Sequence, residues 1–157
     1  MDLLLKKEKK MNRVFVKSRA DFKELLKELT EQQFMASAFI SIHDPGGDWA
    51  PRLEQILVDS DNVLNIWIHD VDEEDDQEKY IHFNNEMANQ VIQFIEKNRK
   101  AKNWILHCTA GISRSGAIGE FISDYLGQDY FQFKRDNPQI NPNSEIKKIL
   151  NNYVRKD

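Results

Sequence analysis

WILHCTAGISRSGAIG, residues 104–119, is the most informative segment of the chain. Its apolar start, Trp104 to Leu106, predicts a short strand, and Ile118 opens the apolar spacing of a helix. Small and polar residues lie between them, among them Cys108, the sole cysteine, with a glycine three positions later and an arginine six positions later. A loop between a strand and a helix N-terminus is a favourable place for an anion.

This loop has the chemistry to hold a tetrahedral oxyanion. Backbone N–H groups at the start of a helix point toward an anion, and Gly111 allows the positive φ and close approach that such wrapping needs. Arg114 can bind two oxygens at once. The same positive field would lower the pKa of the Cys108 thiol, and Ser115 can donate a hydrogen bond to its sulfur.

A competing interpretation makes Cys108 a small buried hydrophobe. A lone cysteine after an apolar strand usually has that role. However, an arginine in a loop that faces the core needs an anionic partner. The combination of Cys108, Gly111 and Arg114 therefore favours an anion site.

The rest of the chain predicts one α/β domain with a central, mostly parallel sheet flanked by helices, because strands and helices alternate. The expected strands are residues 14–16, 36–42, 63–68 and 104–106. Expected helices follow Ser18 (to Leu29) and Pro51, and span residues 80–95, 118–125 and 146–153. Residues 1–12 are expected to form a flexible Lys-rich extension, with the domain over residues 13–157. The loop after the second strand could flank a substrate entrance, but His43, Asp44 and Trp49 are not predicted as site residues.

Composition excludes several classes of protein. Of the 157 residues 40% are hydrophobic, enough to bury a core, and no apolar run approaches the length of a bilayer span. A net charge of -4 gives no reason to expect binding to nucleic acid or to an anionic membrane. One cysteine excludes an internal disulfide and a cysteine-built zinc site. The N-terminal apolar run is too short for a signal peptide, so a reducing cytoplasm is the expected location.

HCTAGISRSG resembles the signature of cysteine-dependent protein phosphatases, which is His-Cys, five residues, then Arg and Ser or Thr. It is most similar to the small dual-specificity branch of the protein tyrosine phosphatase superfamily. LNIWIHD before the acidic run DVDEEDDQE (residues 70–78), and NPQINPNSEI near the C-terminus, are also similar to segments of that family. The resemblance extends over residues 36–154.

The resemblance implies a role for each matching residue. Cys108 would be the nucleophile, Arg114 would bind phosphate and stabilise the transition state, and Ser115 would assist breakdown of a phosphocysteine intermediate. Asp70 would be the general acid, with Asp72 as the alternative and Asp75 as a third choice. His107 would support the loop. The phosphate-binding loop would consist of Thr109, Ala110, Gly111, Ile112, Ser113 and Arg114.

The implied function is a metal-independent protein phosphatase without a cofactor. Its partner would be a phosphorylated protein or peptide that carries phosphotyrosine, with phosphoserine and phosphothreonine open as further substrates. Alternatives are a phosphopeptide-binding pseudophosphatase, an RNA 5′-triphosphatase and a phosphoinositide phosphatase. The absence of lysine from TAGIS disfavours a phosphoinositide, and the acidic run disfavours RNA. Rhodanese-like and arsenate-reducing loops are less similar, because the first needs no Asp70 and the second normally uses further cysteines.

Overall fold

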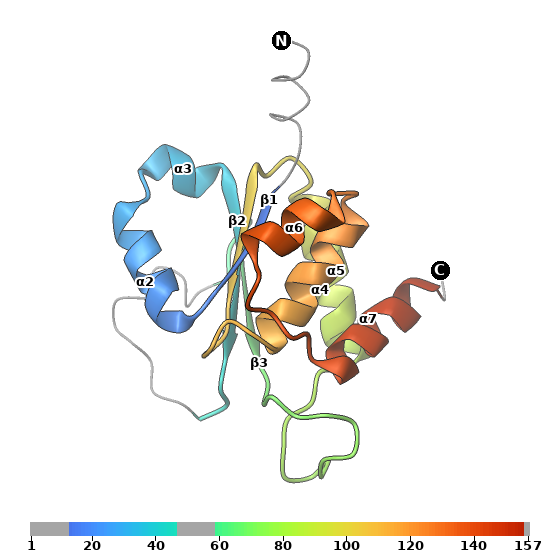
Figure 1. Cartoon of the computed structure of the whole chain (residues 1–157). Helices are drawn as coiled ribbons and strands as arrows, with labels where there is room; N and C mark the ends of the chain where they lie inside the picture. The colour runs from blue at the N-terminus through green and yellow to red at the C-terminus, as the bar shows by residue number, and fades with distance from the viewer. Residues whose placement is uncertain (1–12, 47–58, 156–157) are drawn as a thin grey trace.

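Four parallel strands form the central sheet in the computed structural model, which describes residues 13–46 and 59–155 (Figure 1). The strands are β1 (Arg13–Lys17), β2 (Ser37–His43), β3 (Val63–Trp67) and β4 (Asn103–His107). Their order across the sheet is β1-β4-β2-β3, and each neighbouring pair is parallel. Every residue of the central strand β2 is buried, as expected where helices cover both faces of a sheet.

Helices lie on both faces of this sheet (Figure 1). On one face lie α2 (Arg19–Glu28) and α3 (Glu31–Met35). On the other lie α4 (Asn85–Lys97), α5 (Arg114–Tyr125), α6 (Tyr130–Asp136) and α7 (Ser144–Arg155). The α7 helix packs against α4 and α5. Within the two described stretches, none of the helices combines the length and the apolar character needed to cross a bilayer.

Two apolar clusters hold the layers together. The larger one lies between the sheet and the four later helices and includes the fully buried Trp104 and Ile118. The smaller one joins Phe22 and Leu26 of α2 to Phe39 of β2. Burial of these side chains is the main favourable contribution to folding. The predicted fold class is therefore confirmed.

Most of the expected elements are confirmed, including the N-cap of α2, where the Ser18 side chain accepts from the Asp21 N–H. The helix expected from Tyr80 begins later, at Asn85, so that prediction is wrong. The Asn84 side chain caps this helix by accepting from the Met87 N–H. Phe83 lies in the loop before this helix and is buried, so the apolar spacing of the sequence continues beyond the start of the helix.

Two short helices were not predicted from the sequence. The α3 helix starts at a capping box formed by Thr30 and Gln33, and α6 starts at the cap residue Asp129 and buries Phe133. Each is too short for a clear helical period. Three expectations lie outside the described residues: the helix after Pro51, the packing of Trp49 and the extension over residues 1–12.

The parallel sheet determines where polar residues meet. Because the strands share one direction, the segments after β2, β3 and β4 leave the same edge of the sheet. Those segments bring Asp44, Asp70 and Cys108 to this edge.

Candidate active site

The loop between β4 and α5, residues 108–113, turns its carbonyl groups toward the surrounding chain. Four of these carbonyls accept hydrogen bonds from neighbouring segments: Thr109 from the Arg19 N–H (3.2 Å), Gly111 from Gln139 Nε2 (3.1 Å), Ile112 from the Asn141 N–H (2.9 Å) and Ser113 from the Asn143 N–H (3.0 Å). A peptide group whose carbonyl points outward directs its N–H the other way. The N–H groups of this loop are therefore available to the inside of the turn.

Gly111 is the position at which this turn requires glycine. Its φ is +72°, in the left-handed region that side chains disfavour. A Cβ added there would collide with the backbone of Lys17 and Ser18. The loop therefore packs directly on the end of β1.

Cys108 lies at the base of the loop and is 2% exposed. Its Sγ is 2.9 Å from the Ser115 Oγ. Burial raises the pKa of the thiol, but the hydroxyl and N–H of Ser115 and the N–H groups of Gly111 and Ile112 outweigh it, so the pKa is lowered. These donors stabilise the thiolate, which is the nucleophilic form of cysteine.

Arg114 begins α5, and its side chain turns inward, so that only 5% of it is exposed. Its Nη1 donates to Asp44 Oδ1 (2.6 Å) and to the Ile68 carbonyl (2.8 Å), and its Nη2 donates to Thr109 Oγ1 (3.2 Å). The Nε of Arg114 is buried and has no hydrogen-bond partner within the described part of the chain. Buried charged donors are almost always paired, so this N–H is suited to an anionic ligand.

Asp70 lies at the rim of the same loop. Its Oδ1 accepts from Ser113 Oγ (2.8 Å) and from Asn143 Nδ2 (3.0 Å), and Ser113 directly precedes Arg114. Asp72 and Asp75 instead bond within their own turn, where Asp72 accepts from the Glu74 N–H and Asp75 accepts from the Asp72 N–H, both at 2.9 Å. Of the three carboxylates considered as a proton donor, Asp70 is the one that contacts the loop.

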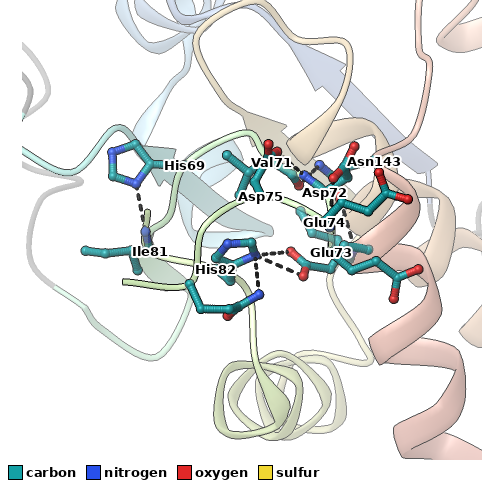
Figure 2. A network of polar contacts seen from close by, with 12 residues as sticks. His69, Val71, Asp72, Glu73, Glu74, Asp75, Ile81, His82 and Asn143 are labelled. Carbon is teal, nitrogen blue, oxygen red and sulfur yellow. Dashed lines mark hydrogen bonds and ion pairs between the residues drawn. The ribbon is translucent and has the colours of Figure 1, made fainter. Parts of the chain in front are cut away.

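The segment that carries Asp70 is closed on itself and fixed to α7 (Figure 2). The N–H of His69 donates to the Ile81 carbonyl, and the N–H of Ile81 donates to His69 Nδ1, each at 2.9 Å. Farther along, His82 Nδ1 is 2.8 Å from Glu145 Oε1, and both side chains are buried. Residues 69–82, here called the acid segment, thus hold Asp70 between two anchors.

His107 supports the loop from inside the core. Its Nε2 is 2.6 Å from Ser41 Oγ, and its ring lies 4.3 Å from the Phe22 ring. Burial lowers the pKa of His107 to about 3, with a further contribution from the neighbouring His43. The imidazole is therefore neutral near pH 7, and its Nδ1 lies 3.4 Å from the Cys108 carbonyl.

The structure thus brings together the sequence-predicted residues Cys108, Arg114, Ser115 and Asp70, with His107 beneath them. Two further residues were missed. Asp44 contacts Arg114 and Thr109, and Asn143 contacts Asp70 while accepting from the Ile146 N–H at the start of α7. The available signal for Asp44 was its position directly after a strand of a parallel sheet. We find no group of ligating side chains suited to a metal ion within residues 13–46 and 59–155.

Solved structures share this fold at low sequence identity. Tk-PTP in its active form matches with a TM-score of 0.56 at 17% identity, over 94% of this chain and 95% of the other. The human tyrosine phosphatase-like serine/threonine/tyrosine-interacting protein matches with a TM-score of 0.54 at 20% identity, over 88% and 85%. Cydia pomonella PTP-2 phosphatase matches with a TM-score of 0.51 at 18% identity, over 89% and 84%. No protein-family model and no curated protein matches the chain. The chain therefore has the fold of tyrosine and dual-specificity phosphatases, as the resemblance implied.

Proposed function

We propose that this protein is a phosphatase that cleaves phosphate monoesters through a phosphocysteine at Cys108. The observation that carries the proposal is the buried Nε of Arg114, which has no partner in the part of the chain described. The next residue, Ser115, has its hydroxyl 2.9 Å from a thiol whose pKa is lowered. A cationic donor without a partner calls for an oxyanion, and a thiolate next to that oxyanion is placed to attack its phosphorus.

The reaction would take two steps. In the first, the Cys108 thiolate attacks phosphorus, an S–P bond forms, the P–O bond to the leaving group breaks, and Asp70 gives the leaving oxygen its proton. In the second, Asp70 removes a proton from water, which attacks phosphorus. The P–S bond breaks and the sulfur leaves as a thiolate, which the Ser115 hydroxyl stabilises by donating a hydrogen bond. Arg114 and the N–H groups of residues 109–114 stabilise the charge on the phosphoryl oxygens in both steps.

A phosphotyrosine-bearing protein or peptide is the substrate class that the site supports best, with phosphoserine and phosphothreonine as further candidates. The loop from Thr109 to Ser113 carries no lysine that could meet extra phosphates. The neighbouring acid segment contributes seven carboxylates between residues 70 and 78, which would repel a polyanionic phosphoinositide or an RNA triphosphate. A reducing compartment, which we expect to be the cytoplasm, would keep the thiol active.

A phosphopeptide-binding module without turnover is the second candidate, because the same oxyanion site would serve it. The retention of Cys108, Ser115 and Asp70 around Arg114 favours the enzyme. The two functions make different predictions for Cys108→Ser. An enzyme loses turnover and keeps phosphopeptide binding, whereas a binding module has no turnover to lose.

The direct test is hydrolysis of p-nitrophenyl phosphate and of a phosphotyrosine peptide, with and without a strong metal chelator. We expect hydrolysis that the chelator does not change and that Cys108→Ser lowers by at least about 1,000-fold. A panel of phosphothreonine peptide, phosphoinositide and triphosphate RNA ranks the substrate classes. Wild-type protein that binds phosphopeptide but hydrolyses none of these compounds would contradict the proposal.

A further inference from the structure

We propose that Asp44 is the positioning residue for Arg114, which it holds so that the Nε–Nη2 edge of the guanidinium faces the phosphate. This inference rests on the proposed function and adds a residue that neither the signature nor the resemblance includes. Asp44 directly follows β2, which is the strand beside β4 in the sheet. Strand order therefore places it opposite the loop that begins at Cys108.

Asp44 uses both carboxylate oxygens on the loop. Its Oδ1 accepts from Arg114 Nη1 at 2.6 Å, and its Oδ2 accepts from Thr109 Oγ1 at 2.7 Å. The Thr109 hydroxyl in turn accepts from Arg114 Nη2 at 3.2 Å. One carboxylate thus fixes the guanidinium at two nitrogens, once directly and once through Thr109.

The backbone completes the arrangement on the Nη1 side. Nη1 carries two hydrogens, and the Ile68 carbonyl at 2.8 Å accepts the second. Protein groups therefore occupy Nη1 fully. Nε, which has no partner within the described residues, and the remaining hydrogen of Nη2 form the edge that is left for two phosphate oxygens.

A carboxylate beside this arginine could instead compete with phosphate. A competing carboxylate would be expected to bind the Nε–Nη2 fork, since that geometry satisfies both of its oxygens. Asp44 contacts Nη1 and Thr109 instead, so it leaves the fork open. In addition, only 5% of the Arg114 side chain is exposed. A buried cation needs a counter-charge when no phosphate is bound.

Ionisation of Asp44 agrees with this role. Burial raises the pKa of its carboxyl, but the hydrogen bonds from Thr109 and Arg114 and the charge of Arg114 outweigh it, so the pKa lies below its ordinary value. The carboxyl of Asp44 is therefore ionised near pH 7.

The test measures binding of inorganic phosphate by calorimetry in the Cys108→Ser background, and kcat/KM for p-nitrophenyl phosphate in the wild-type background. We expect Asp44→Ala to weaken phosphate binding and to lower kcat/KM, each by about 10- to 100-fold. Asp44→Asn should have a smaller effect, because its amide oxygen still accepts from Nη1. Glu28→Gln is the matched control, since it removes one exposed negative charge at the end of α2, outside the acid segment, and should change neither quantity.

A double-mutant cycle separates positioning from a general structural role. Asp44→Ala is combined with Arg114→Lys, which keeps the positive charge but loses the fork. If Asp44 acts through Arg114, its effect on phosphate binding largely disappears in the Arg114→Lys background, whereas an independent structural role gives additive losses. Additive losses would overturn the inference.

Two other outcomes would overturn the inference as well. Unchanged phosphate binding in Asp44→Ala would show that the contact does not position the arginine, and tighter binding would identify Asp44 as a competitor of phosphate. The binding arm does not depend on turnover. A protein that binds phosphate without hydrolysing esters would therefore contradict the proposed function and still test Asp44, whereas a protein that binds no phosphate contradicts both.

Discussion

The protonation state of one sulfur controls the proposed chemistry at the scale of single residues. Cys108 is buried, which alone would keep the thiol neutral, and hydrogen-bond donors on α5 and in the loop reverse that effect. The Ser115 hydroxyl lies 2.9 Å from the Cys108 Sγ. The reactivity of the thiol should therefore depend on this hydroxyl.

Ser115→Ala should raise the pKa of Cys108, because it removes a hydrogen bond that favours the thiolate. Since the thiolate is the reactive form, alkylation by iodoacetamide near pH 6 should slow by about tenfold. The rate should approach that of the wild type at alkaline pH, where both thiols are ionised. Ser123→Ala, which lies in the same helix away from the sulfur, serves as the control. If the midpoint of the pH profile of alkylation were the same in Ser115→Ala as in the wild type, this account would be contradicted.

The proposed choice of proton donor also rests on contacts of single residues. Asp70 contacts Ser113 and Asn143, whereas Asp72 bonds within its own turn. Asp70→Asn should lower kcat for an alkyl or peptide phosphate by about 100- to 10,000-fold and leave phosphate binding nearly unchanged. Asp72→Asn is the matched control and should stay close to the wild type. The opposite result for the two variants would assign the acid to Asp72.

At the scale of elements, the loop between β4 and α5 depends on one backbone conformation and one close contact. Gly111 and Gly127 both have a positive φ, at +72° and +74°. A Cβ at Gly111 would collide with the backbone at the end of β1, whereas a Cβ at Gly127 would meet nothing within 4 Å. The two glycines therefore separate backbone strain from collision.

Gly127→Ala should lower the free energy of unfolding by about 1–2 kcal/mol through the left-handed conformation alone. Gly111→Ala should cost more than Gly127→Ala, because the loop must also move away from Lys17, and it should abolish phosphate binding. Chemical denaturation together with phosphate calorimetry measures both effects. Equal losses of stability with phosphate binding retained would contradict the proposed packing of the loop.

The buried pair of His82 and Glu145, which fixes the acid segment to α7, should make the free energy of unfolding depend on pH. Burial lowers the pKa of His82, but its hydrogen bond to Glu145 and the charge of Glu145 outweigh this, so the pKa is raised above 6.5. A raised pKa means that the folded state binds the proton more tightly than the unfolded state. The stabilisation is thus fully present below pH 6.5 and is lost as the pH rises through the pKa of the folded state.

Glu145→Gln should therefore lower the melting temperature more near pH 5.5 than near pH 8.5. Thermal unfolding of the wild type and the variant at both values measures this difference. Glu120→Gln, which removes a carboxylate that pairs with Lys147 and has no histidine partner, serves as the control. A loss that is equal at the two pH values, or larger at the alkaline one, would contradict the ionic contribution of this pair.

At the scale of the whole molecule, the features that can be predicted from the sequence are those that depend on the pattern of neighbouring residues. The strands, the layered fold and the grouping of Cys108, Arg114 and Ser115 can be inferred because each rests on neighbouring residues. The start of α4 could not be predicted, because Phe83 is buried from a loop and prolongs the apolar spacing. The contact of Asp44 with Arg114 joins segments 70 positions apart and depends on the order of the strands.

The same reasoning explains why Asn143 was missed. Its side chain links Asp70 of the acid segment to the start of α7, although Asn143 and Asp70 are 73 positions apart. Neither segment alone contains a pattern that reveals the contact. The candidate site is thus a loop of neighbouring residues whose partners, Asp44 and Asn143, come from distant parts of the sequence. Only the folded structure brings these partners to the loop.

Trapping the phosphocysteine is the most direct test of the central claim. In this experiment, wild-type protein is mixed with a fast-reacting aryl phosphate and the reaction is quenched in acid within the first turnover. The protein is then digested, and the masses of its peptides are measured by mass spectrometry. The account predicts one phosphoryl group on the peptide that contains Cys108, with greater accumulation in Asp70→Asn, where attack by water is slowed. Ester hydrolysis that proceeds with the Cys108 peptide unmodified, and at an equal rate in Cys108→Ser, would contradict it.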